Sequence, residues 1–140
     1  MSKFLMTDVK VTVNGVDLSD YAYQVDTPDS RAQVDVSGFN PNGTQEYLPG
    51  QKTQSIVINF IQAFGSNEPH RVLQPLYASG TTFAITVQPT SAAVGVGNPT
   101  YGGTATLYEY DGLNGALNAR AEITATFLPA SNTGFAWGTS

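Results

Sequence analysis

Few side chains in this 140-residue chain are suited to acid, base or nucleophile chemistry, because it has one histidine and no cysteine. His70 falls in the first turn of a predicted helix, and no serine lies in the Gly-x-Ser-x-Gly turn of a hydrolase nucleophile. The absence of cysteine excludes disulfides, thiolate zinc sites, cysteine nucleophiles and iron–sulfur clusters. We therefore expect His70 to be an ordinary surface histidine, and we predict no catalytic residues.

Carboxylates are the remaining groups that could bind a metal or move a proton. Two aspartate pairs lie close in sequence: Asp17 with Asp20, and Asp26 with Asp29. Neither pair has the ligand series and the glycine of a calcium loop, so we expect solvated turn residues. Glu109 and Glu122 lie on facing predicted strands, where a glycosidase-type acid/base pair is conceivable, but a salt bridge or a solvated face is favoured. The sequence predicts no metal, no cofactor and no enzyme.

One glycine-rich segment begins like the phosphate-binding turn of dinucleotide-binding proteins. It reads GVGNPT over residues 95–100. The third glycine of the fingerprint is missing, and Pro99 prevents the helix that should follow. We expect a loop before a strand and no nucleotide cofactor.

The charge balance argues against a protein that binds nucleic acid through its phosphates. Six basic against eleven acidic residues give a net charge of −5, whereas phosphate binding needs clustered lysine and arginine. Charged residues make up 12% of the chain, about half the usual share, and 16 threonines supply much of its polarity. Such a surface is typical of a subunit that meets other subunits, since interface cores are depleted in charge. An ordinary acidic β-domain fits the composition equally well.

No segment is typical of a signal peptide or of a membrane span. The apolar run at residues 4–6 is too short for a signal-peptide core, and no stretch approaches 18 apolar residues. We expect a soluble product that is made and kept in the cytoplasm.

Alternating apolar residues predict a mainly β protein with about seven strands. Val11 and Val13 precede the turn Asn14-Gly15, a strong hairpin signal. Further strands are predicted at Leu18–Val25, around Val34 and Val36, and at Gln54–Phe64, Thr82–Gln88, Tyr101–Tyr110 and Leu117–Leu128. Short strands that are separated by turns indicate a β-sandwich or a β-barrel.

A single short helix is predicted over Glu68–Ser79. Asn67 is its candidate N-cap and Gly80 suits its C-terminus. Pro75 removes a backbone donor in the middle of the segment, so we expect the helix to be short or kinked.

Three segments are candidates for interaction. Residues 38–52 lack periodicity and hold three glycines and two prolines, and such long loops are usually functional or disordered. Terminal arms are expected at residues 1–8 and 129–140 of a single domain that spans 1–140. Aromatic anchors in such arms often enter pockets on a partner, although each arm could equally fold back onto its own domain. The candidate contact residues are Phe39, Asn40, Tyr47 and Leu48 in the loop and Phe4, Phe135 and Trp137 in the arms.

The order of segments over about residues 8–129 resembles the tail-tube, or major tail, proteins of long-tailed bacteriophages, especially those with non-contractile tails. The resemblance lies in a VNG–LS opening, a Gly/Pro loop before the longest strand, and an Asn-Pro-x-Tyr-x-Gly approach to the last hairpin. These segments read VNGVDLSDY, QVDVSGFNPNGTQEYLPG, SIVINFIQAF and GVGNPTYGG.

The resemblance implies a β-sandwich or barrel with one flanking helix. It also implies a structural virion protein whose six copies form a ring, with rings stacked into a hollow tube through which DNA passes without specific binding. Its partners would be further copies of itself, the tape-measure protein and other tail proteins, in the virion after assembly in the host cytoplasm. The loop at 38–52 and the terminal arms would contact neighbouring subunits.

Two alternatives remain open from the sequence. One is another ring-forming virion part, such as a tail terminator, a distal tail protein or an adaptor. The other, less favoured, is a carbohydrate-binding β-module, prompted by four tyrosines: Tyr21, Tyr23, Tyr101 and Tyr108.

Overall fold

The computed structural model describes residues 3–139, which form ten strands and one helix. The N-terminal part contains β1 (Lys10–Val13), β2 (Val16–Asp17), β3 (Ala22–Asp26), β4 (Asp29–Asp35), β5 (Tyr47–Gln54) and β6 (Ile56–Ile61). The C-terminal part contains α1 (Pro69–Ser79), β7 (Phe83–Gln88), β8 (Thr100–Tyr110), β9 (Glu122–Pro129) and β10 (Ala136–Gly138). Residues 1, 2 and 140 of the predicted arms lie outside the described residues.

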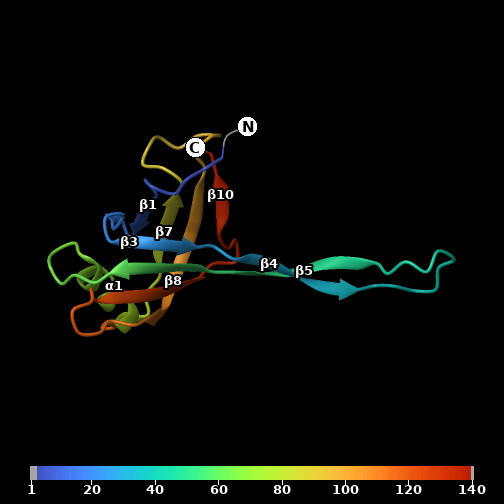
Figure 1. The fold of residues 1–140 in the computed structure, drawn as a ribbon. Coiled ribbons are helices and arrows are strands. Elements are labelled where there is room, and N and C mark those ends of the chain that lie inside the picture. The colour runs from blue at the N-terminus through green and yellow to red at the C-terminus, as the bar shows by residue number, and fades with distance from the viewer. Residues whose placement is uncertain (1–2, 140) are drawn as a thin grey trace.

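Eight strands form one antiparallel sheet in the order β2-β1-β7-β8-β9-β6-β3, with β10 paired to β8. In Figure 1, β1, β7 and β10 run across the direction of β3, so the sheet is bent over itself. The first half of β8 pairs with β7 and its second half with β9, so this strand belongs to both parts of the bend. The mainly β class and the single flanking helix are confirmed, with more strands than the seven predicted.

The core lies inside the bend of the sheet and is made by the predicted alternating residues. The ring of Phe83 on β7 meets the ring of Phe127 on β9 edge-on, with centroids 5.8 Å apart. The fully or nearly fully buried strand residues include Val11, Val13, Ile56, Ile58, Phe60, Phe83, Ile85, Val87, Ile123, Ala125 and Phe127. The period of two therefore identified the inward faces of these strands.

Turn chemistry explains where two elements begin. Asn14 and Gly15 both have positive φ, 51° and 81°, which is the conformation of the tight hairpin that joins β1 to β2. Asn67 also has a positive φ, 59°, whereas an N-cap residue needs an extended backbone. The predicted cap at Asn67 is therefore wrong, and the extended Glu68 is the N-cap of α1.

The helix is short, as predicted, and runs through Pro75 over eleven residues. Leu73 and Leu76 are buried on its inner side, where α1 packs against β8. His70, in the first turn, is only partly exposed, and its Nδ1 lies 2.7 Å from the hydroxyl of Tyr110 at the end of β8. The histidine is thus part of a structural contact between helix and sheet rather than a free surface residue.

Candidate self-assembly surfaces

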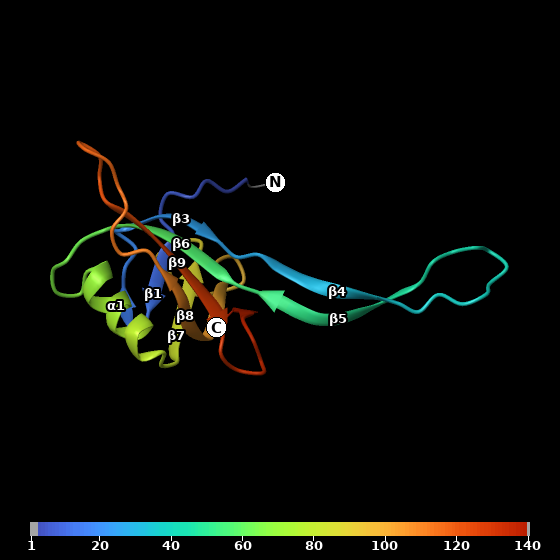
Figure 2. The same ribbon diagram turned by 90° about the horizontal axis from the view of Figure 1, so that it is seen from below.

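The strands β4 and β5 leave the body of the protein as a long two-stranded ribbon, which we call the arm (residues 29–54). Figures 1 and 2 show it projecting from one end of the body, away from α1. Every residue of β4 is exposed. The predicted loop at 38–52 is wrong in extent, because residues 47–52 belong to β5 and the irregular tip covers only residues 36–46. The two strands support each other locally, a pairing that the Gly/Pro composition obscured.

The arm has two different faces. On one face Val34 lies opposite Leu48, with Ala32 and Val36 as neighbours on the same side. Val34, Val36 and Leu48 expose 47%, 44% and 57% of their surface. The other face carries the pairs Arg31–Lys52, Gln33–Pro49 and Asp35–Tyr47, and it is polar apart from Pro49 and Tyr47, which is 49% exposed. A two-stranded ribbon is marginal by itself in water, so an amphipathic one needs a surface to cover its apolar face.

The tip of the arm is ordered by Asn40. Its Nδ2 donates to the carbonyl of Thr44 at 2.8 Å, and its Oδ1 accepts from the amides of Asn42 and Thr44 at 3.1 and 3.2 Å. Phe39, beside it, is fully exposed. The structure therefore gives Asn40 an internal role at the tip and leaves the Phe39 side chain in solvent.

A buried amide fixes the base of the arm to the C-terminal segment. The Nε2 of Gln54 donates to the carbonyl of Phe135 at 2.9 Å, and its Oε1 accepts from the Phe135 amide at 3.0 Å. The same Nε2 also donates to Asp29 at 3.1 Å, so Gln54 ties both arm strands to the segment. We call this contact the clasp. Gly134 has φ 65° and leaves no room for a side chain beside the Gln54 oxygen.

The C-terminal segment does not extend from the body as predicted for an arm at 129–140. It returns through β10, which pairs with β8, and Phe135 is 1% exposed with its ring against Tyr101. The placement of Phe135 among the intermolecular contacts is therefore wrong for the described chain, because its aromatic ring completes the core. Trp137, two residues later, remains 60% exposed.

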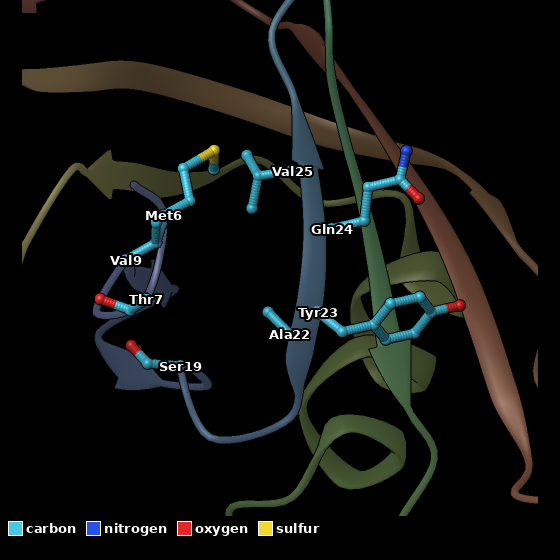
Figure 3. Close-up of a pocket in the computed structure, with 8 residues that line it drawn as sticks. All are labelled: Met6, Thr7, Val9, Ser19, Ala22, Tyr23, Gln24 and Val25. Carbon is cyan, nitrogen blue, oxygen red and sulfur yellow. The ribbon is translucent and has the colours of Figure 1, made fainter. Parts of the chain in front are cut away.

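Trp137 and Phe4 line an apolar groove of about 340 Å³. Met6, Val25 and Tyr101 form further parts of its wall, and the rings of Tyr101 and Trp137 are 4.8 Å apart. Beside it lies a smaller cavity of about 190 Å³, in which Met6, Thr7 and Val9 face Ala22 and Val25 of β3 (Figure 3). Both lie where β3 passes the N-terminal segment, so the two exposed aromatic residues of the termini share one surface.

The two glutamates considered as an acid/base pair, Glu109 and Glu122, are separated. Glu109 lies opposite Thr126, four residues from Glu122 on β9, which is about 13 Å along the strand. Glu122 instead forms an ion pair with Arg120 at 3.0 Å and accepts a hydrogen bond from the Tyr23 hydroxyl at 2.7 Å. The hydrogen bond from Tyr23, followed by Arg120, lowers the pKa of Glu122. The favoured salt-bridge interpretation thus holds for Glu122.

The tyrosines that prompted the carbohydrate alternative have other partners. Tyr101 is buried, Tyr21 donates to Glu68 at 2.9 Å, and the guanidinium of Arg120 lies 4.4 Å from the centre of the Tyr23 ring. Tyr108 is the most exposed of the four at 58%.

Within residues 3–139 no group of three or more histidine, aspartate or glutamate side chains is arranged to hold a metal ion. In that same part of the chain, no helix has the length and apolar character needed to cross a membrane.

Sequence reasoning predicted a strand at Val34 and Val36 but missed its place in a projecting ribbon, and it missed the clasp. Val34 and Val36 alternate with polar residues, and this pattern predicts a half-buried strand face without saying which surface covers it. Gln54 carries no signal in the sequence, since its partner Phe135 is 81 residues away.

No protein-family model matches the sequence, and no curated protein matches it. Solved structures do. A chain of the virion of a native gene transfer agent particle aligns with a TM-score of 0.73 and 14% identity over 95% of each chain. A chain of the tail of an empty gene transfer agent particle with C6 symmetry aligns with a TM-score of 0.70 and 15% identity, covering 94% of this chain and 93% of that one.

The SPP1 tail tube aligns with a TM-score of 0.73 and 11% identity, covering 99% of this chain and 80% of that one. These likenesses span the arm as well as the body, because nearly the whole chain is covered. They confirm the tail-tube-like fold that the order of segments predicted.

Proposed function

We propose that the chain is a structural subunit that assembles with copies of itself into stacked hexameric rings, which form the hollow tube of a phage-type tail. The observation that carries this proposal is the arm, whose apolar face is exposed in the single chain. The fold it shares with chains of tail and virion assemblies supports the same conclusion.

The apolar face of the arm supplies part of the free energy of association, a few kcal/mol if its exposed half is buried. Fully burying one Val or Leu side chain contributes about 1.5–3 kcal/mol, and three such residues are close to half exposed on the apolar face. The arm extends roughly 35 Å from its base, so it reaches well beyond the surface of its own body. A contact in which the arm of one copy lies on the body of the next is heterologous, and such contacts close into rings or continue as filaments.

The charge of the chain suits a conduit for DNA. Six copies at −5 each carry −30 per ring, so the ring as a whole repels phosphates rather than capturing them. In this proposal the lumen passes DNA without specific binding, the tape-measure protein and other tail proteins are further partners, and the chain acts structurally rather than as an enzyme. It is assembled in the host cytoplasm and resides in the virion tail.

Negative-stain microscopy of two proteins tests the proposal. The first is the wild type, and the second has residues 32–51 replaced by Asn-Gly, which joins Arg31 to Lys52 through a tight turn and leaves the clasp intact. We expect long hollow tubes from the wild type and folded monomers from the shortened chain.

Four outcomes would favour an alternative or contradict part of the proposal. Isolated rings that do not stack would favour a tail terminator, distal tail or adaptor protein. Monomers that bind glycans would favour a carbohydrate-binding module. Normal tubes from the shortened chain would show that the arm is not needed for assembly. A submicromolar DNA complex in a gel shift would contradict the proposed lumen.

A further inference from the structure

Two cations lie directly opposite each other on the polar face of the arm. Arg31 pairs in register with Lys52, and like charges at facing positions of a ribbon destabilise it. The next residue on this face of β4, Asp29, is held by Gln54, and Arg31 itself donates a long hydrogen bond to the Gly50 carbonyl. Within residues 3–139 neither cation forms an ion pair. A repulsive pair that persists on an exposed ribbon indicates an anionic partner.

Arg120, on the body, shows which groups bind an arginine side chain in this protein. Arg120 lies over the ring of Tyr23 at 4.4 Å and forms an ion pair with Glu122, which also accepts the Tyr23 hydroxyl hydrogen bond. A tyrosine ring, a carboxylate and a guanidinium thus form one closed set, held by cation–π and charge-assisted contacts.

The same set without its cation occurs near the end of β8. Tyr77, Tyr108, Glu109 and Asp111 line a pocket of about 430 Å³, which we call the Tyr108 pocket. A register shift between Leu107 and Glu109 leaves Tyr108 outside the ladder with β9, and such bulges re-aim side chains. In the described part of the chain neither carboxylate has an ion-pair partner. With Tyr110, which also lines it, the pocket therefore has three tyrosine rings and two carboxylates but lacks a guanidinium.

The arm and the Tyr108 pocket are at opposite ends of the molecule. Figures 1 and 2 both show the arm leaving one end of the body, while α1 and residues 111–121 lie at the other. Tyr77 is on α1 and Asp111 begins that loop, so the arm of one chain points away from its own pocket. When two copies meet head to tail, the arm base of one faces the pocket end of the next.

We infer that the arm base of one copy docks on the Tyr108 pocket of a second copy, with Arg31 and Lys52 placed against Glu109 and Asp111. The guanidinium of Arg31 lies on a tyrosine ring, as Arg120 lies on Tyr23. This inference rests on the proposed self-assembly and specifies its polarity, because every copy offers one cationic surface and one acidic surface.

Charge reversal in two separate chains tests the pairing. One variant carries Arg31→Glu with Lys52→Glu, and the other carries Glu109→Lys with Asp111→Lys. Each variant by itself has two surfaces of like charge, so we expect at least about a tenfold loss of pelletable assemblies. A one-to-one mixture restores both kinds of contact and recovers tubes in which the two variants alternate. The charge-conserving exchange Arg31→Lys with Lys52→Arg is the control, and it assembles within about threefold of the wild type.

The outcomes distinguish this inference from the proposed function. Circular dichroism first establishes that each variant is folded, as expected for exposed positions outside the core. Wild-type tubes together with normal assembly of either reversed variant would overturn the pairing and leave the tube proposal intact. Failure of the mixture to assemble, after each variant has failed separately, would also overturn it. A wild type that forms no assemblies would contradict the proposed function itself.

Discussion

The body and the arm of this chain use the same kind of β pattern with opposite results. In the body, the alternating residues of β7 and β9 meet each other across the core, and Phe83 and Phe127 are buried. In the arm, Val34 and Leu48 pair across the ribbon but remain about half exposed. The body covers its apolar residues within one chain, whereas the arm leaves its apolar face in solvent. Apolar alternation therefore identifies a covered face without identifying which molecule covers it.

The largest effect is expected from a substitution in the core of the body, which does not change the arm. Phe127→Ala removes a fully buried ring that packs on Phe83, so we expect a loss of about 3–5 kcal/mol in the free energy of unfolding. Urea denaturation followed by circular dichroism measures this loss. A loss below about 1 kcal/mol would show that the two parts of the bent sheet are not packed as described.

The second largest effect is expected at the clasp, which joins the arm to the body. Gln54→Ala leaves the amide and the carbonyl of Phe135 without their side-chain partner, which costs about 1–3 kcal/mol in unfolding free energy. It also frees the arm base, so we expect fewer tubes at a given concentration. Gln33→Ala, an exposed glutamine of the arm, is the matched control. Equal stability of the two variants would contradict the clasp.

These two positions illustrate what the sequence can and cannot predict. The inward faces of β1, β6, β7 and β9 followed from period-two alternation, because each was covered within the same domain. The tail-tube-like fold followed from the order of segments. The extent of the arm did not, since residues 47–52 pair only with β4 and contain Pro49 and Gly50. Phe135 was misplaced because a contact with Gln54, far away in sequence, holds it in the core.

Changing the apolar face of the arm separates assembly from stability. Val34→Ser with Leu48→Ser alters exposed positions, so the free energy of unfolding of the monomer should change by less than about 0.5 kcal/mol. Assembly should be lost, because the hydrophobic contribution of this face is removed. Sedimentation and urea denaturation of the same samples check both parts. Gln33→Ser on the polar face is the control, and tubes from the double variant would contradict the role of the apolar face.

The smallest effect is expected at a surface contact within the body, between Tyr23, Arg120 and Glu122. The Tyr23 hydrogen bond and Arg120 lower the pKa of Glu122 in the folded chain below its ordinary value of 4.5. The stabilisation is therefore fully present above about pH 4.5 and is lost as the pH falls through the lowered folded value. Tyr23→Phe removes the largest cause, so its Glu122 should titrate closer to 4.5. Carboxyl chemical shifts followed against pH measure this, and identical curves for both proteins would contradict the contact.

If a second copy covers the apolar face of the arm, a single cysteine placed on that face becomes less reactive on assembly. The chain has no cysteine, so Val34→Cys introduces a unique thiol on that face and Gln33→Cys introduces one on the polar face. Alkylation rates by iodoacetamide are compared between assembled protein and dilute monomer. We expect the thiol at position 34 to react at least about tenfold more slowly in the assembly, and the thiol at position 33 to change much less. Equal rates at position 34 in both states would show that no second copy covers this face.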